Sequence, residues 1–464
     1  MKKLTMLAAL LALVGAVHAA TDVPAGSITT SQTWTAAGNP YRLKGQVYVT
    51  GGATLTIEAG VGVRSLVADQ GSLAICRDGY IQVLGTCDNP VIMTSAADNG
   101  TWRAACNEWG NLTIMGNGLI SASHYDGLPV THQDGYSSPV VTNGKLPNGT
   151  TKKVMEGLTA DAPGDPKVLY GGANDDDDRG EIHYLSLRYG GKVIGLANEL
   201  NGLSLGALGR ETEIDHIDIM NNVDDGIEIW GGTVELKYVN IWNIGDDSFD
   251  VDEGWRGSAQ YGLIVQGYSI DAKQGSGFGD NCFETDGAED SDAQPVTTAR
   301  ISNFTVIGQP VQGDGATTWR DNARVQYDNM LFVDIGEKLV RFDGDDGDGA
   351  SGYGYNGTLS WADTWTTPAG TRSTVNAGNN AAVYDPYDRQ DPAGYLAQIS
   401  NSISYNYFTA AGVPNYSGTD YAEANARGWN DAANNNVTQP ATSPITSITR
   451  EAVFTNTAEG KDFY

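Results

Sequence analysis

A six-residue hydrophobic pattern recurs along this chain and constrains its fold more than any other feature. Apolar residues occupy the first, fourth and sixth positions, polar or aromatic residues fill the rest, and a polar turn follows. The pattern is clear in IHYLSL at 182–187, IDHIDI at 214–219, LKYVNI at 236–241 and ISNFTV at 301–306, and looser copies start at 325 and 399. Copies at 214 and 236 start 22 residues apart and those at 301 and 325 start 24 apart, so the repeat unit is about 22 residues.

A repeat of this length with strand alternation inside each unit predicts a β-solenoid. One short strand cannot bury its apolar face alone, but coiling stacks it on the equivalent strand of the previous turn, about 4.8 Å away. We therefore expect Ile182, Ile214 and Leu236 in one inward column. The segments QVYVTGGATLTI at 46–57, YIQVLGT at 80–86 and PVIMTS at 90–95 continue the rhythm. An antiparallel β-sandwich is the alternative, and the in-register repeats favour the solenoid.

Composition and charge exclude several classes of function. Hydrophobic residues make up 40% of the 464 residues and charged residues only 18%, which argues against intrinsic disorder. The formal net charge of −29 is unsuited to nucleic acid or to an anionic membrane, since both require a basic surface. We expect no nucleic-acid partner and no membrane span.

The first 19 residues have the features of a secretory signal peptide. Lys2 and Lys3 precede an apolar run at 4–17, and Val17 and Ala19 are small residues at the positions that precede cleavage. We expect cleavage after Ala19 and a secreted, periplasmic or cell-surface protein. The four cysteines, Cys76, Cys87, Cys106 and Cys282, would then meet an oxidising compartment. Four cysteines allow three connectivities, and we favour a Cys76–Cys87 disulfide across a short turn-containing stretch.

The remaining chain, 20–464, reads as a single β-helix domain with two long insertions. Segments near 121–180 and 343–395 are polar and rich in Gly, Pro and Asp, and they break the repeat. Each contains a run of aspartates, NDDDDR at 174–179 and DGDDGDG at 343–349, which we interpret as solvated loops.

Carboxylates gather on two adjacent repeat units. In NNVDDGIEIWGG at 221–232 and NIGDDSFDVDEG at 243–254, an offset of 22 superposes Asp224 on Asp246, Asp225 on Asp247 and Glu228 on Asp250. Like charges one strand spacing apart raise one another's pKa or recruit a cation, and carboxylates suit Ca²⁺. A ladder of solvated turn aspartates is the alternative. The predicted Ca²⁺ ligands are Asp224, Asp246, Asp247, Asp250, Asp252 and Glu253.

Three tryptophans are interleaved with these carboxylates. Trp230, Trp242 and Trp255 could offer aromatic faces to a sugar ring, or they could pack into the core. On the first interpretation they are the substrate-binding residues of a glycan groove over the carboxylates.

The layout as a whole resembles the pectin-lyase-like right-handed β-helix proteins. The stretch 110–340 is similar to a group of secreted bacterial β-helix proteins of mostly unassigned function, through WGNLTIMG at 109–116, ELNGLSLG at 199–206, DDGIEIWGG at 224–232 and GDDSFDVDEG at 245–254. The resemblance implies an all-β fold, a right-handed parallel β-helix (solenoid) with long loop insertions.

A shorter resemblance links the same carboxylates to polygalacturonases, which carry Asn-Thr-Asp-Gly and, one turn later, Gly-Asp-Asp. VDDG at 223–226 and GDDS at 245–248 are similar. The resemblance implies Asp225, Asp246 and Asp247 as acid and water-activating groups of an inverting hydrolase. The family's Asn is Val223 here, its Gly-His-Gly falls near Gly267, and no Arg-x-Lys clamp follows.

Two functions remain open at this stage. The first is a non-catalytic exported β-helix that binds polysaccharide or cell-envelope glycan, or forms part of the cell surface, with Ca²⁺ in its acidic turns. The second is a polysaccharide-degrading enzyme, a glycoside hydrolase or a lyase, acting over the carboxylate ladder. The missing histidine and basic clamp favour the first.

Overall fold

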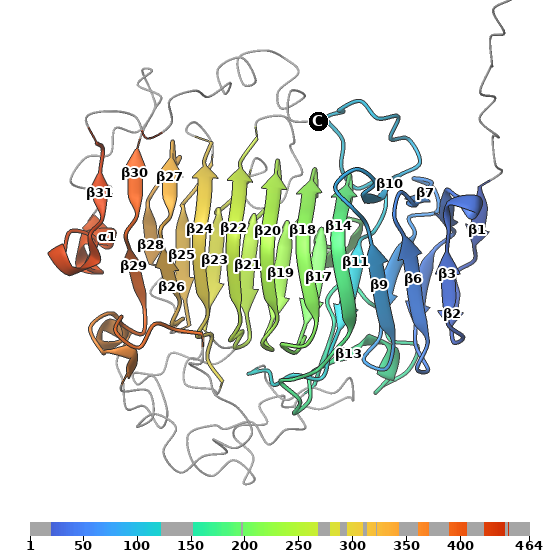
Figure 1. Cartoon of the computed structure of the whole chain (residues 1–464), viewed down its shortest axis with the longest axis horizontal. Helices are drawn as coiled ribbons and strands as arrows, with labels where there is room; N and C mark the ends of the chain where they lie inside the picture. The colour runs from blue at the N-terminus through green and yellow to red at the C-terminus, as the bar shows by residue number, and fades with distance from the viewer. Residues whose placement is uncertain are drawn as a thin grey trace, which may run out of the picture.

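The structure is a computed structural model, and it describes residues 20–121, 152–195, 198–267, 279–287, 295–309, 313–321, 323–342, 361–370, 389–405, 422–440 and 444. The predicted signal peptide at 1–19 and the aspartate run at 343–349 lie outside these residues. In the part described, two long sheets of parallel strands wind along one axis, and Figure 1 shows their strands side by side from β1 to β31. The predicted parallel β-helix is confirmed.

The larger sheet has 17 strands among the described residues. Its members are β1 (Thr21–Val23), β3 (Gln32–Trp34), β4 (Tyr41–Leu43), β6 (Thr54–Glu58), β7 (Gly62–Ser65), β9 (Tyr80–Leu84), β10 (Val91–Ser95), β14 (Gly180–Arg188), β18 (Glu213–Met220), β20 (Glu235–Trp242), β22 (Ser258–Val265), β24 (Arg300–Ile307), β26 (Gln326–Asp328), β27 (Leu331–Val333), β29 (Gln398–Ser400), β30 (Ile403–Tyr405) and β31 (Val437–Thr438).

The smaller sheet has 10 strands in the same portion of the chain. They are β2 (Gly26–Ile28), β5 (Gln46–Val49), β8 (Ser72–Ile75), β11 (Leu112–Met115), β17 (Leu203–Gly206), β19 (Ile227–Trp230), β21 (Phe249–Asp252), β23 (Phe283–Asp286), β25 (Thr317–Arg320) and β28 (Val340–Phe342). Two further pairs of short antiparallel strands are hydrogen-bonded to neither sheet. They are β12 (Lys153–Val154) with β13 (Leu169–Tyr170) and β15 (Val193–Gly195) with β16 (Asn198–Glu199).

Helical segments in the described part of the chain are short. They comprise η1 (Ala36–Gly38), η2 (Pro166–Val168), η4 (Trp361–Trp365), α1 (Ala422–Ala426) and η6 (Ala432–Asn434), with α1 at the C-terminal end of the stack in Figure 1. No helix in the described ranges is long and apolar enough to cross a bilayer.

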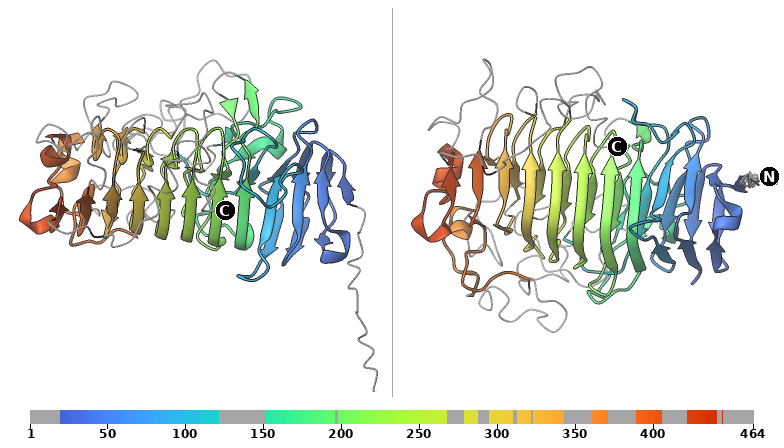
Figure 2. Two further views of the ribbon diagram at one scale, coloured as in Figure 1. Left: turned by 90° about the horizontal axis from the view of Figure 1, so that it is seen from above. Right: turned by 45° about the horizontal axis from the view of Figure 1, so that its top comes forward.

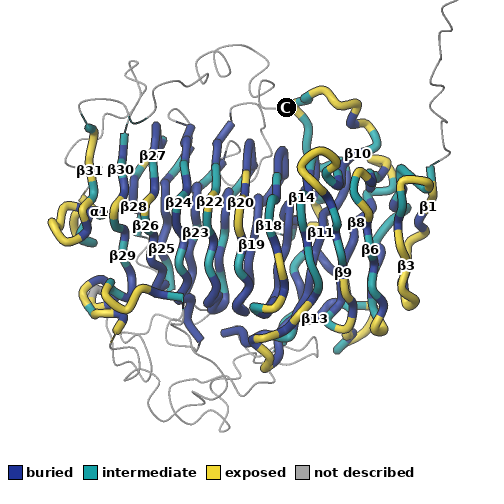
Figure 3. The backbone as a smooth tube through the Cα atoms, in the orientation of Figure 1, coloured by how far each residue is buried: buried dark blue, intermediate teal, exposed yellow. Residues whose placement is uncertain are grey.

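The repeat register agrees with the sequence pattern. Ile182 pairs with Ile214, which pairs with Leu236, and all three side chains are buried between the sheets. Because parallel strands stack position on position, apolar residues meet their own kind one turn later and form a continuous core. Figure 2 shows the stack from two further sides, and Figure 3 shows burial concentrated along its central strands.

Each long strand of the larger sheet bends at one residue. The first half of β14 pairs with β9 and its second half with β10, and Tyr184 between them has a φ of 51°. The bend recurs on each of the next four turns, at His216, Tyr238, Tyr261 and Asn303, where φ is 54°, 57°, 64° and 61°. This left-handed conformation is uncommon outside glycine, so its repetition indicates a bend that the fold requires on every turn.

The insertion between β11 and β14 is partly folded rather than a solvated loop throughout. Met155, Val168 and Tyr170 pack with Met115 and Trp230 on the smaller sheet. The prediction of a solvated aspartate run is wrong for Asp175 and Asp177.

Asp175 and Asp177 are buried, with 6% and 2% of their surface exposed. Asp175 makes a bidentate ion pair with the fully buried Arg256, whose Nη1 and Nη2 donate over 2.5 and 2.8 Å. Asp177 pairs with Arg179 over 2.9 Å. The Asp175–Arg256 pair attaches the end of the insertion to the solenoid, and breaking it would leave an uncompensated buried charge.

The predicted Cys76–Cys87 disulfide is absent. Cys76 follows β8 on the smaller sheet and is buried, with Sγ 3.3 Å from the carbonyl oxygen of Lys167. Cys87 is exposed and follows β9 on the larger sheet. The prediction is wrong because the residues between them form an extended strand, which advances about 3.3 Å per residue and separates its ends.

We predict that Leu236→Ala lowers the free energy of unfolding by about 2–5 kcal/mol, because it leaves a cavity in the inward column. Urea denaturation followed by circular dichroism measures the change. Lys237→Ala, at the neighbouring exposed position, is the control and should change stability by no more than about 0.5 kcal/mol. Equal effects of the two substitutions would contradict the register.

Candidate functional site

Two of the predicted catalytic carboxylates hold the turns that lead into the smaller sheet. Asp225 Oδ1 accepts the backbone N–H of Asp247 over 3.0 Å, and Asp247 Oδ1 accepts that of Asn281 over 2.6 Å. Asn201 precedes them in the column and accepts the N–H of Asp225 over 3.2 Å. Each side chain therefore satisfies a backbone donor one turn further on, which gives Asp225 and Asp247 a structural role.

A second column of carboxylates lies on the outward surface of the smaller sheet. Glu228 of β19 pairs with Asp250 of β21, as the 22-residue offset predicts, and Asp250 pairs with Glu284 of β23. We call this surface, with the turns before it, the acidic face. Its members are Asp224, Asp225, Glu228, Asp246, Asp247, Asp250, Asp252, Glu284 and Asp286.

Burial and mutual repulsion favour the protonated form of four carboxyl groups on the acidic face. Removal from water, and then the neighbouring carboxylates, raise the pKa of Asp225, Glu228, Asp247 and Asp250 well above the ordinary range. Glu228 shares a hydrogen bond with Glu156, and Asp247 shares one with Glu284. A hydrogen bond between two carboxyl groups needs a proton on one of them, so such pairs form only while one member is neutral.

One arginine compensates part of this charge. Arg320 donates to both carboxylate oxygens of Asp286 over 2.9 and 2.8 Å and also forms an ion pair with Glu284. Burial nevertheless raises the pKa of Asp286 to about 7, because desolvation outweighs the arginine. The C-terminal end of the acidic face is thus partly neutralised.

Two groups of carboxylates are close enough to hold a cation. Oxygens of Asp224, Asp225 and Asp246 lie within 4.8 Å of one another, and so do those of Asp225, Glu228 and Asp250. Oδ1 of Asp250 is buried without a hydrogen-bond partner in the structure as described. An orphaned carboxylate oxygen beside other carboxylates fits a hard cation such as Ca²⁺.

Three predicted metal ligands lie outside these groups. Asp247 accepts the backbone N–H of Asn281 and shares a hydrogen bond with Glu284. Asp252 raises the pKa of Glu228 and Asp250 but belongs to neither group. Glu253 is fully buried and instead contacts Lys153 Nζ over 2.5 Å and the Tyr170 hydroxyl over 2.6 Å. Glu253 thus lies apart from both groups, and its carboxylate anchors the folded insertion.

The three tryptophans do not form an exposed platform. Trp230, Trp242 and Trp255 are 5%, 7% and 0% exposed. Trp230 packs against Tyr170, Trp242 against Trp102, and the Trp255 indole donates to the carbonyl of Val234 over 3.0 Å. The prediction of sugar-stacking tryptophans is wrong here, because the rings pack beneath neighbouring segments.

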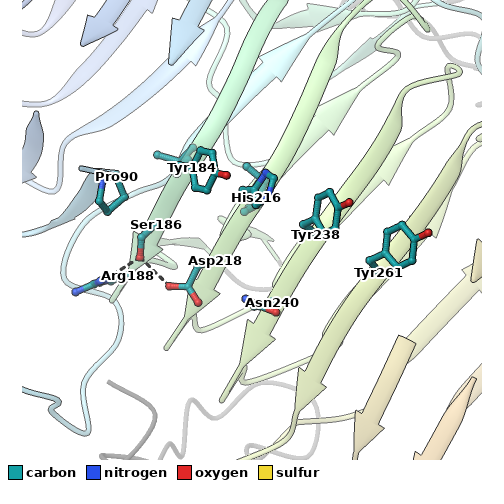
Figure 4. Close-up of a pocket in the computed structure, with 11 residues that line it drawn as sticks. Pro90, Tyr184, Ser186, Arg188, His216, Asp218, Tyr238, Asn240 and Tyr261 are labelled. Carbon is teal, nitrogen blue, oxygen red and sulfur yellow. Dashed lines mark hydrogen bonds between the residues drawn. The ribbon is translucent and has the colours of Figure 1, made fainter. Parts of the chain in front are cut away.

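Exposed aromatic rings lie instead at the bends of the larger sheet. Tyr184, His216, Tyr238 and Tyr261 come from four successive strands and stack with ring centroids 4.1, 4.5 and 5.2 Å apart. Tyr238 and Tyr261 are each 45% exposed. Figure 4 shows the rings in one row, which we call the aromatic ridge.

A hollow of about 450 Å³ runs beside the aromatic ridge. Its polar floor contains Ser186, whose hydroxyl donates to Asp218 over 2.8 Å and accepts from Arg188 Nε over 2.7 Å (Figure 4). Burial raises the pKa of Asp218. We call this hollow the aromatic groove. It is lined by Pro90, Tyr184, Leu185, Ser186, Arg188, His216, Ile217, Asp218, Tyr238, Asn240 and Tyr261.

The sequence contained a signal for the aromatic groove. Tyr184, His216 and Tyr238 all occupy the third position of the hydrophobic repeat, and Asp218 and Asn240 share its fifth position. Recurrence at one position places side chains in one column. Which columns are concave depends on the bend at the third position, and the alternation of apolar and polar residues does not reveal that bend.

Comparison with known proteins gives one match. A family model described as a pectate-lyase-like β-helix domain matches residues 26–134 and 146–430, which is most of the chain. No curated protein and no solved structure matches.

We predict that the metal-free protein loses stability as the pH rises from about 4 towards 7. Burial raises the pKa of Asp286 and Asp314 from 3.8 to about 7, so the folded protein retains protons that the unfolded chain has already lost. Their contribution to stability is fully present below the unfolded pKa and is lost as the pH rises through 7. Each such proton changes the free energy of unfolding by at most about 1.4 kcal/mol per pH unit.

Urea denaturation in chelator at several pH values tests this sign. Asp250→Asn should reduce the loss, because it removes a charge that deprotonation would bury on the acidic face. Asp22→Asn, at an exposed position, should leave the pH dependence unchanged. Stability that rises steadily over this range in the wild-type protein would refute the prediction.

Proposed function

The chain belongs to the family of pectate-lyase-like β-helix domains, which indicates a carbohydrate-related role, and we propose that it is an exported, non-catalytic protein that binds a glycan. The aromatic groove is the observation that carries this proposal. It combines ring edges and phenol hydroxyls with amide, hydroxyl and carboxyl groups, and such a concave mixture of apolar and polar groups suits a ligand with hydroxyls and C–H surfaces. The glycan would belong to the extracellular medium or the cell envelope.

Burial of the acidic face supports binding rather than catalysis. Asp225 and Asp247 are only 7% and 4% exposed, and each holds a backbone N–H of the next turn. A catalytic acid or base must reach the proton that it transfers in the bound substrate. Asp246 is partly exposed, but a hydrolase built on this trio would require its other two members to leave their structural bonds.

We predict that Tyr238→Ala weakens glycan binding about tenfold, a loss of about 1.4 kcal/mol, because it removes an exposed ring from the middle of the aromatic ridge. Affinity electrophoresis through a panel of neutral and acidic polysaccharides identifies a ligand, and calorimetry measures the affinity. Tyr80→Ala removes an exposed tyrosine outside the groove and should have no effect. Equal losses in the two variants would contradict the location.

The same panel tests the alternative, a glycoside hydrolase or polysaccharide lyase acting over the acidic face. Product release by the wild-type protein that disappears in Asp247→Asn, with folding intact, would overturn the non-catalytic proposal. Release that persists in the variant would place an active site elsewhere.

We also propose that Ca²⁺ stabilises the acidic face through Asp225, Glu228 and Asp250, with Asp224, Asp225 and Asp246 as a second, overlapping group. Support comes from the convergence of their oxygens within 4.8 Å and from the orphaned Oδ1 of Asp250. A bound cation would also offset the repulsion among these carboxylates.

We predict that Ca²⁺ at about 100 times its dissociation constant raises the free energy of unfolding by about 2.7 kcal/mol relative to chelator. Asp250→Asn should abolish most of this gain, since it removes a charged ligand from the first group. Asp176→Asn, at an exposed position, should keep it. A melting temperature that is the same in chelator and in millimolar Ca²⁺ would eliminate the calcium proposal.

A further inference from the structure

We propose that Glu181, His183 and Glu213 form a binding site for a divalent transition-metal ion such as Zn²⁺ on the outer surface of the larger sheet. One ligand atom from each residue lies within 4.8 Å of the others. The three come from β14 and β18, so an ion would bridge two successive turns. The site is separate from the acidic face, which lies on the other sheet, and the proposed glycan binding does not require it.

The backbone register brings the two glutamates together. Glu181 and Glu213 are direct partners in the parallel pairing of β14 with β18. Like charges directly opposite one another destabilise a sheet. The next glutamate of the column, Glu235, forms an ion pair with Arg389. Among the described residues, by contrast, neither Glu181 nor Glu213 has an ion pair with lysine or arginine. His183 can compensate Glu181 only while its imidazole is protonated, and a cation bound to the neutral imidazole would supply that compensation instead.

The imidazole of His183 is held in the orientation that a metal ligand needs. Its Nε2 lies 3.5 Å from Glu181 Oε2, and its Nδ1 lies 3.0 Å from Asp215 Oδ2. Histidine ligands commonly donate their second N–H to a carboxylate, which fixes the tautomer and the ring orientation. With Asp215 accepting from Nδ1, the lone pair of Nε2 is directed to the side of the ring where Glu181 lies.

The donor set selects the class of ion. One imidazole nitrogen with two carboxylates suits Zn²⁺ and related transition metals, whereas Ca²⁺ takes oxygen ligands. Three protein ligands leave a position for water, as in open zinc sites. Side chains of Glu181 and His183 are 38% and 25% exposed, so an ion can enter from solvent.

The proposed site is linked to the aromatic ridge through Asp215. Its Oδ1 lies 2.7 Å from Nδ1 of His216, and its Oδ2 contacts His183. His216 in turn stacks between Tyr184 and Tyr238. An ion on His183 would therefore fix the carboxylate that orients a ring of the aromatic ridge, and Asp215 acts as a positioning residue for both histidines.

Calorimetric titration of the mature full-length protein with Zn²⁺ near pH 8, in the presence of Ca²⁺ to occupy oxygen-only sites, tests the proposal. We expect a site whose affinity falls at least tenfold in His183→Gln and in Glu213→Gln. Glu235→Gln is the matched control, because it removes one carboxylate from the same column and should retain the affinity. Glu213 is exposed, so its variant keeps the test valid if the histidine variant fails to fold.

Electron paramagnetic resonance with Cu²⁺ adds a readout specific for nitrogen ligation. Nitrogen splitting that disappears in His183→Gln would support the assignment. Unchanged Zn²⁺ affinity in His183→Gln and Glu213→Gln would overturn it, and so would an equal loss in Glu235→Gln, which would indicate general attraction to a negative surface. The absence of Zn²⁺ binding by the wild-type protein would overturn it as well.

Discussion

Hydrogen bonding of each strand to its counterpart one turn away determines nearly everything else in this molecule. The pairing is parallel and in register, so a residue at one position of the repeat meets the residue at the same position of the next turn. Similar side chains are brought together whether or not their contact is favourable. Apolar positions gain a continuous core from this rule, whereas charged positions accumulate repulsion.

The polar columns show three ways of managing that consequence. Turn residues such as Asp225 and Asp247 bond to backbone donors, so their stacking closes the turns. Bent positions carry rings that stack on one another and then asparagines, with Asn329 donating to Asn303 over 2.6 Å. At the outward strand positions, burial and neighbouring carboxylates raise the pKa of Glu228 and Asp250, and Glu284 forms an ion pair with Arg320.

Periodicity alone was enough to predict the repeating part of this structure. The pairings of Ile214 with Leu236 and of Glu228 with Asp250 follow from a 22-residue offset, and that of Ile182 with Ile214, 32 residues apart, follows from equal position in the hydrophobic repeat. The carboxylates of the candidate calcium groups could therefore be located almost completely. The offset did not reveal which of these carboxylates also bond to the backbone of the next turn, as Asp225 does.

Features that depend on the insertions could not be predicted in the same way. Trp230 is covered by Tyr170, Glu253 is engaged by Lys153, and Asp175 is paired with Arg256, and each of these contacts joins segments 60 or more residues apart with no shared period. The disulfide prediction failed for a related reason, since Cys76 and Cys87 are near in sequence but follow strands of different sheets. Local composition identified the insertions but not the surfaces they cover.

Along the column of bent positions, aromatic residues give way to asparagines, and this change sets the length of the aromatic part. Tyr184, His216, Tyr238 and Tyr261 occupy four successive turns, and the column continues as Asn303, Asn329, Asn401 and Asn435. With turns about 4.8 Å apart, the aromatic part extends for roughly 14 Å before the chemistry changes. A linear polymer lying along this column would meet rings over a few units and amides beyond them. The column therefore presents aromatic rings at one end and amides at the other. The two directions in which such a polymer could lie would place different parts of it on the rings.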